Sequence, residues 1–186
     1  MTTTTKSLEN LPTYASIRSA YLALVEVASI AEIARAATWY SEAQDIAREL
    51  SIRYNEPLDR VACVIAAFSP RTTWAKNVVN AQNFLAGETV PTLTNNVNMA
   101  RNGLRDGFTA LKGRKTNAFA HNIAGYSNYV TVDVWMIRAA GYNRLDANKG
   151  MYDLISDVVI DLASLYGITP MQMQALIWIR ARGSAE

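Results

Sequence analysis

Apolar residues recur at steps of three and four along almost the whole chain, and this helical period restricts the fold more than any other feature. No stretch of useful length alternates between apolar and polar residues, as a half-buried strand does. The sequence therefore predicts an all-α domain of eight to ten helices. In the first half of the chain, helices are expected at 14–25 and at 30–54, the second with a break into two near 39–41. A helix with Pro57 in its first turn is expected around 61–68, the next runs from a cap at Thr72 or Thr73 to Leu85, and a short one follows Thr94. The remaining helices are expected at 115–124, 133–140, 154–165 and 170–179.

The stretch from Val61 to Phe68 is apolar on every side of a helix. A helix of this kind has no face to offer to water, so it is expected to be the central, buried helix of the domain.

Length and composition place the chain in a broad class. Its 186 residues are half apolar, enough for one core, and we expect a disordered tail at 1–10 followed by a single domain at 11–186. No apolar run reaches the roughly 18 residues of a membrane span, and no secretory signal is visible. A single cysteine, Cys63, excludes an intramolecular disulfide and a four-cysteine cluster. We expect a cytoplasmic protein with no membrane partner, no metal and no cofactor.

Charge is distributed unevenly along the chain. Residues 1–59 carry five Lys and Arg against eight Asp and Glu, and residues 60–186 carry thirteen against eight. The stretch 101–115 holds five basic residues opposed only by Asp106. This suits a phosphate backbone, although an ordinary solvated loop has the same composition.

The most informative segment joins a basic turn to an acidic helix start. Gly113, Arg114 and Lys115 follow a turn ahead of a helix, and Asp133 opens the next helix eighteen residues after Lys115. Backbone N–H groups at such a turn can bind an anion, and a lysine there supplies a cation or an amine nucleophile. A carboxylate at a helix start can stabilise a sugar cation, although Asp at this position also serves as a plain N-cap and Lys115 as a surface residue.

Two motifs in this order resemble the helix-hairpin-helix DNA glycosylase superfamily of the endonuclease III type. They are Gly-Arg-Lys-Thr at 113–116 and Val-Asp at 132–133. An apolar helix ending in Ser-x-x-Thr at 69–72 resembles the one that borders the base pocket of that family. The resemblance covers roughly residues 58–141 and implies a helix-hairpin-helix DNA glycosylase-like fold and a partner, double-stranded DNA, from which one base is flipped out.

The resemblance also implies roles for particular residues. Asp133 becomes the catalytic carboxylate and Lys115 a possible nucleophile that forms a Schiff base with the sugar. The DNA-contacting residues are expected at Lys112, Gly113, Arg114, Thr116, Arg71 and Lys76. The residues expected in the base pocket are Ser69, Thr72, Trp74, His121, Trp135, Gln172 and Gln174, with a packing or surface role as the alternative for several of them.

Two other functions stay open from the sequence. The hairpin keeps only the second glycine of the family pattern, and Val-Asp-Val-Trp at 132–135 resembles compact relatives linked to phage DNA hypermodification. That resemblance implies a transferase that replaces pyrophosphate on hydroxymethyluracil in DNA with an amine or amino acid. The weakened hairpin also fits a domain that binds DNA or a protein without chemistry. The sequence does not indicate the oligomeric state.

Overall fold

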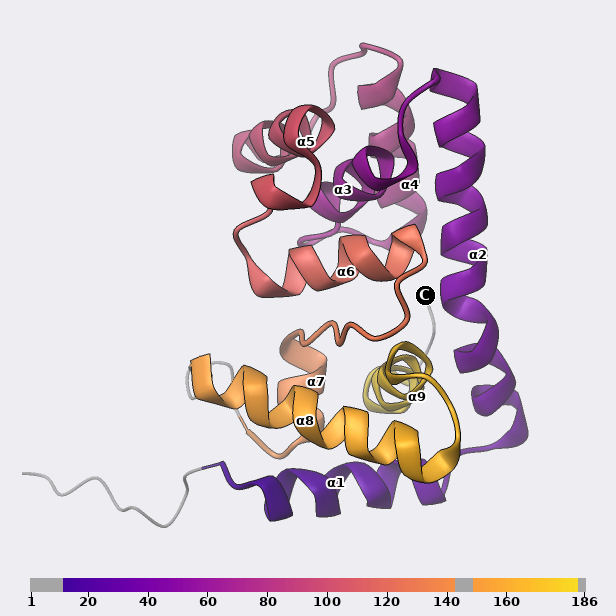
Figure 1. Cartoon of the computed structure of the whole chain (residues 1–186), viewed down its shortest axis with the longest axis vertical. Coiled ribbons are helices and arrows are strands. Elements are labelled where there is room, and N and C mark those ends of the chain that lie inside the picture. The colour runs from indigo at the N-terminus through magenta and orange to yellow at the C-terminus, as the bar shows by residue number, and fades with distance from the viewer. Residues whose placement is uncertain (1–11, 143–148, 184–186) are drawn as a thin grey trace, which may run out of the picture.

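Every regular element in the described part of the chain, residues 12–142 and 149–183 of this computed structural model, is a helix (Figure 1). The all-α prediction is confirmed, with nine α-helices and one 3-10 turn in those ranges. The tail predicted at 1–10 lies outside the described residues. The elements are α1 (Tyr14–Glu26), α2 (Ile30–Tyr54), α3 (Leu58–Phe68), α4 (Trp74–Leu85), α5 (Thr94–Asp106), η2 (Gly107–Ala110), α6 (Arg114–Ala124), α7 (Val134–Ala139), α8 (Lys149–Tyr166) and α9 (Pro170–Arg182).

The helix α3 is the centre of the first half of the fold. All eight residues from Val61 to Phe68 are fully buried, as the sequence predicts. The helices α2, α4, α5 and α6 pack around α3 and cover its faces. An apolar helix can be stable in water only when such neighbours surround it.

The helices form two groups that share α2. The first group is α3 to α6, and the second is α1 with α7, α8 and α9, in which α9 contacts each of the others. The long helix α2 runs beside both groups and packs against α3 and α6 at one end and α9 at the other (Figure 1). The candidate site lies between the two groups.

Local sequence signals set many of the helix ends. Thr13, Ser29 and Thr169 each begin a helix with a capping box, in which the side chain accepts from the third helical N–H. Gly125 ends α6 in the left-handed conformation that glycine adopts readily. These positions agree with those expected from the sequence.

Two sequence expectations are wrong. The break near Trp39 to Ser41 does not occur, and α2 is continuous from Ile30 to Tyr54. The residue Tyr40 is buried and donates a hydrogen bond of 2.7 Å to Gln174 of α9, so tertiary packing supports the helix at the point where the local pattern is irregular.

The helix after Thr94 is also longer than expected, with thirteen residues. Its asparagines have low helix propensity, but Ala100 and Gly103 are buried, and α5 packs closely on α3. This packing stabilises a helix that propensity alone does not favour.

No single helix among the described residues is both long and apolar enough to cross a membrane. The helices α8 and α9 meet the length and composition criteria only together, from Gly150–Tyr166 to Pro170–Arg182, with a bend of 105° between them.

The closest approach of α5 to α3 predicts an unusual effect of a glycine substitution. A Cβ added to Gly103 would lie 2.8 Å from the Cβ of Cys63, closer than two side-chain carbons can approach. Alanine at an exposed helix position stabilises by about 1 kcal/mol relative to glycine, but overpacking costs about 1–3 kcal/mol. We expect Gly103→Ala to lower the free energy of unfolding, measured by urea denaturation.

The control for this substitution is Asn102→Ala, which lies on the exposed face of the same helix and should be neutral or stabilising. Equal or higher stability of Gly103→Ala would contradict the close packing of α3 and α5.

A second prediction concerns acid stability. Glu32 accepts hydrogen bonds from the backbone N–H of Ser29 and from Arg180 at 2.7 Å, and these contacts lower the pKa of Glu32 to about 2. The stability that Glu32 contributes is therefore complete above its ordinary pKa of 4.5 and is lost as the pH falls towards 2. We expect Glu32→Gln to be less stable than the wild type at pH 7 and to lose less stability between pH 4.5 and pH 2.

The measurement is chemical unfolding at several pH values in that interval. Glu88→Gln is the control, because Glu88 is exposed and has no ion pair among the described residues. Parallel stability curves for Glu32→Gln and the wild type would show that the Ser29 and Arg180 contacts contribute nothing.

Candidate active site

A cavity of about 960 Å³ lies between the two helix groups, with α2 along one side. Its size is near the upper end of the range of about 300–1,000 Å³ for small-molecule sites. Both helix groups and α2 contribute to its lining. The residues are Trp39, Tyr40, Ser69, Pro70, Arg71, Thr72, Thr73, Trp74, Asn77, Lys115, Phe119, Thr131, Val132, Asp133, Val134, Trp135, Ile137, Arg138, Gln174, Ala175, Trp178, Ile179 and Arg182.

Asp133 is held in place by three donors. It is the N-cap of α7, and its Oδ1 accepts from the backbone N–H groups of Trp135 at 2.8 Å and Met136 at 3.1 Å. Its Oδ2 accepts from the indole N–H of Trp178 on α9 at 3.0 Å. A carboxylate has about four lone-pair positions, so one remains for a ligand in the cavity. The predicted N-cap role and a role in the site are therefore compatible.

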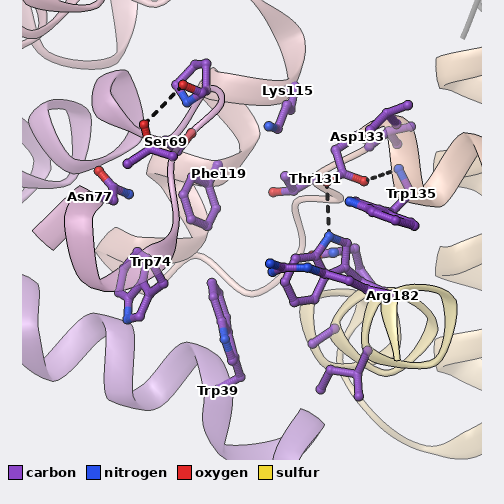
Figure 2. Close-up of a pocket in the computed structure, with 18 of the residues that line it drawn as sticks. Trp39, Ser69, Trp74, Asn77, Lys115, Phe119, Thr131, Asp133, Trp135 and Arg182 are labelled. Atoms are coloured by element: carbon purple, nitrogen blue, oxygen red, sulfur yellow. Dashed lines mark hydrogen bonds between the residues drawn. The ribbon is translucent and has the colours of Figure 1, made fainter. Parts of the chain in front are cut away.

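Lys115 reaches the same cavity from the other helix group. It lies in the first turn of α6, is half-buried, and lines the cavity together with Asp133. Figure 2 shows the amine of Lys115 above the central space and the carboxylate of Asp133 to its side. The structure thus brings the two predicted catalytic residues together at one cavity.

Aromatic rings form much of the cavity wall, and all four tryptophans of the chain line it. The ring centroid of Trp39 lies 5.4 Å from that of Trp74 and 6.1 Å from those of Phe119 and Trp178. Trp39, Trp74 and Phe119 border one side of the central space, and Trp135 lies across from them (Figure 2). Flat apolar walls of this kind bind a planar ring by stacking.

Two arginines stack on tryptophans of the cavity lining. The guanidinium carbon of Arg138 lies 5.0 Å from the ring centroid of Trp135, and that of Arg182 lies 4.9 Å from Trp178. Stacking directs both cations towards the cavity while leaving their N–H groups available. Both arginines line the cavity.

The cavity lining has more cationic than anionic groups. Lys115, Arg71, Arg138 and Arg182 are its cations, and Asp133 is its carboxylate. None of the four cations takes part in an ion pair with another described residue. A cavity with this balance favours an anionic ligand.

Arg71 has an unusual backbone conformation. Its φ is +61°, in the left-handed region that is uncommon for a residue with a long side chain. It lies in the turn between α3 and α4 and lines both the main cavity and a second one of about 500 Å³. Strain of this kind is often found where a side chain must be directed at a ligand.

The floor of the cavity is a buried hydrogen-bond network. Tyr40 donates to Gln174 at 2.7 Å, and Asn122 donates to Thr131 at 3.2 Å and to the Tyr40 hydroxyl at 3.3 Å. Burial raises the pKa of Tyr40 to about 12, so its hydroxyl stays protonated and can donate. The network joins α2, α6 and α9 to the loop that precedes Asp133.

The structure places many of the predicted site residues at the cavity. Of the expected base-pocket residues, it brings Ser69, Thr72, Trp74, Trp135 and Gln174 to the lining. Of the expected DNA-contacting residues, Arg71 lines it and Lys76 lines the second cavity next to it.

Two of the expected base-pocket residues lie elsewhere, which corrects the sequence prediction. His121 is stacked between Phe108 at 3.8 Å and Tyr129 at 4.0 Å between ring centroids. Gln172 forms the capping box at the start of α9 through Thr169. Neither residue lines the cavity, because each side chain has a local partner in its own part of the fold.

The hairpin residues that do not line the cavity differ in their exposure and in their contacts. Lys112 and Gly113 are exposed, whereas Thr116 is buried. Arg114 forms an ion pair with Asp153 and stacks on Tyr152 with 4.1 Å between its guanidinium carbon and the ring centroid. Arg114 therefore fastens α6 to α8.

Several lining residues were not selected from the sequence, including Trp39, Phe119, Asn77, Arg138 and Arg182. A signal existed for the two arginines, since each follows a tryptophan by three or four residues, the spacing that places two side chains on one helix face. The sequence contains no comparable signal for Trp39 or Asn77, because only packing brings α2 and α4 together at the cavity. Among the described residues, no three His, Cys, Asp or Glu gather as metal ligands would.

Comparison with known proteins identifies a family that the chain matches. A model described as a family of unknown function (DUF7178) matches residues 4–185. No curated protein and no solved structure matches the chain.

The N-cap role of Asp133 predicts a difference between two substitutions. Asparagine is also a good N-cap, whereas alanine at an N-cap costs about 0.5–2 kcal/mol. We expect Asp133→Ala to lower the free energy of unfolding more than Asp133→Asn does, by a margin in this range, as measured by urea denaturation. Equal losses would show that Asp133 does not stabilise the start of α7.

Proposed function

The chain belongs to the DUF7178 family of unknown function, and from its cavity we propose that it processes a base in DNA. The substrate is a modified pyrimidine flipped out of the duplex, and the reaction resembles that of a DNA glycosylase. We also propose that the fold is of the helix-hairpin-helix glycosylase type. The observation that carries the proposal is the convergence of Asp133 and Lys115, eighteen residues apart, on one aromatic cavity.

Asp133 is suited to stabilise a sugar cation. When the bond between C1′ and the base breaks, its electron pair leaves with the base and positive charge develops on the sugar. The two backbone N–H groups and the Trp178 indole hold the carboxylate in one orientation, so little reorganisation is needed as this charge appears. Water then forms a bond to C1′ and loses a proton.

Lys115 offers a second route at the same carbon. Its amine can replace water as the nucleophile, forming a C–N bond to C1′ and losing a proton. Opening of the sugar ring then gives a Schiff base. The neutral form of the amine is the nucleophilic form.

The hairpin ahead of α6 supports an approach to DNA. Gly113 has a φ of −76°, which any residue adopts, and a Cβ there would meet only Thr116 at 3.8 Å. Neither backbone conformation nor packing therefore requires glycine at this position. The absence of a side chain leaves the first N–H groups of α6 uncovered, as phosphate binding requires.

The charge of the cavity favours a second candidate function. Four cations of the lining have no carboxylate partner among the described residues, and they suit a base that carries its own phosphate groups. The second candidate is a transferase that replaces pyrophosphate on hydroxymethyluracil in DNA with an amine or amino acid. The amine forms a C–N bond to the substituent carbon of hydroxymethyluracil. The C–O bond to pyrophosphate breaks, pyrophosphate leaves with the electron pair, and the amine loses a proton.

The test is incubation of the protein with duplex oligonucleotides that carry one altered base. The bases are uracil, hydroxymethyluracil, oxidised pyrimidines and pyrophosphorylated hydroxymethyluracil, the last with and without amino acids. We expect a product by nucleoside mass spectrometry, and we expect Asp133→Asn to reduce its rate by about 10²-fold or more, as loss of one electrostatic group in a site does. Equal rates for both proteins on every substrate would overturn the role of Asp133.

Lys115 separates the possible mechanisms. Borohydride reduction traps a Schiff base, so an adduct formed by the wild type and absent in Lys115→Ala supports the lyase route. A product without an adduct supports hydrolysis or group transfer. DNA binding that survives Asp133→Ala, with no product from the wild type, would show a binding domain instead.

A further inference from the structure

One end of the cavity is formed by α4 and the turn before it. Trp74 and Asn77 lie there on α4, and Ser69 lies in the turn. Figure 2 shows these three side chains beside Phe119, on the opposite side of the central space from Asp133. This end is therefore distinct from the end that holds the two proposed catalytic groups.

The side chain of Asn77 is buried without a full set of partners. It is 1 % exposed, and its Oδ1 accepts no hydrogen bond from any residue that the structure describes. A buried amide oxygen without a donor is unfavourable, and few such atoms are found in native structures. Asn77 is also a residue of the cavity lining, but its Oδ1 is itself buried, so the side-chain amide must turn before a ligand there can supply the missing donor.

The neighbouring hydroxyl groups both donate hydrogen bonds to backbone carbonyl groups. Ser69 donates to the carbonyl of Ala66 at 2.9 Å, and Thr72 donates to the carbonyl of Pro70 at 3.3 Å. A hydroxyl has a single proton, so both can only accept from a ligand. This end of the cavity thus offers acceptors between aromatic walls.

We propose that Asn77 reads the pairing edge of the flipped pyrimidine by accepting a hydrogen bond from an N–H group on that edge. This inference rests on the proposed function. The aromatic side chains Trp39, Trp74 and Phe119 stack against the ring, and Asn77 contacts its edge. The side-chain amide turns about a broad terminal torsion, which allows its oxygen to meet the donor of the ring. The sugar then lies towards Asp133 and Lys115.

An N–H on the pairing edge has two chemical sources, the ring N3–H of a uracil-type base and the amino group of a cytosine-type base. Methylation removes each donor and leaves the ring in place. The matched pairs are uracil with N3-methyluracil, and cytosine with N4,N4-dimethylcytosine, each at one position of the same duplex. A duplex with an abasic analogue measures binding that does not involve a base.

The experiment measures affinity in the Asp133→Asn background, so that the base is not removed during the titration. The readouts are fluorescence anisotropy of labelled DNA and quenching of tryptophan emission, which reports on the cavity because every tryptophan lines it. With Asn77 present, we expect the duplex that carries at least one of the unmethylated bases to bind about tenfold more tightly than the duplex with its methylated partner. Such a ratio of affinities corresponds to the loss of roughly one hydrogen bond. The pair that discriminates identifies the donor.

Asn77→Leu removes the acceptor at nearly constant volume. It should abolish the preference within the pair and leave the affinity for the abasic duplex unchanged. Its unfolding midpoint should equal or exceed that of the parent protein, because an unpaired buried polar atom has been replaced by an apolar one. A residue with only a structural role would instead lower the midpoint and leave the preference intact.

Asn80→Leu is the matched control. Asn80 lies on the same helix, is also buried and also has an unpartnered side-chain atom, but it does not line the cavity. It should keep the preference within the pair.

The possible failures can be told apart. If neither pair discriminates, or if Asn77→Leu keeps the preference, while the wild type still forms a product, the role of Asn77 is wrong and the proposed function stands. If the wild type forms no product and binds no duplex more tightly than the abasic one, both proposals fail.

Discussion

The complete burial of α3 is the constraint on which the rest of the structure depends. A helix that is apolar on all sides must be surrounded, and α2, α4, α5 and α6 supply the surrounding surfaces. At Gly103 the α5 backbone approaches so closely that a single added carbon would collide with α3. With α4 and α6 fixed in this way, the turn at Ser69 and the first turn of α6 face the second helix group, and the cavity lies between them.

Asp133 has a structural role within the second helix group. As an N-cap it stabilises α7, and its bond to Trp178 joins α7 to α9. The same three hydrogen bonds that stabilise the fold orient the carboxylate at the cavity. A helix cap and the proposed catalytic carboxylate can therefore be the same side chain, and asparagine is the more informative substitution because it keeps the cap and removes the charge.

The arginines of the cavity lining have no carboxylate partner among the described residues. Six arginines outside the lining form ion pairs, but Arg71, Arg138 and Arg182 in the lining form none with a described residue. Cations that line one cavity repel, and a bound anion relieves this repulsion. Together with the aromatic walls and the Asn77 Oδ1, which has no donor among the described residues, this arrangement favours a ligand that combines a planar ring with phosphate, as a nucleotide does.

The sequence by itself determined the helical class, the central position of Val61 to Phe68 and many of the helix ends, because periodicity and capping are local properties. It also selected Asp133 and Lys115, since a carboxylate at a helix start and a lysine after a glycine turn are local patterns too. Only the tertiary structure decided that α2 continues through Tyr40, that His121 stacks on Phe108 and Tyr129 away from the cavity, and that Trp39 and Asn77 reach it. These outcomes depend on contacts between helices far apart in the chain, and no local pattern encodes which faces meet.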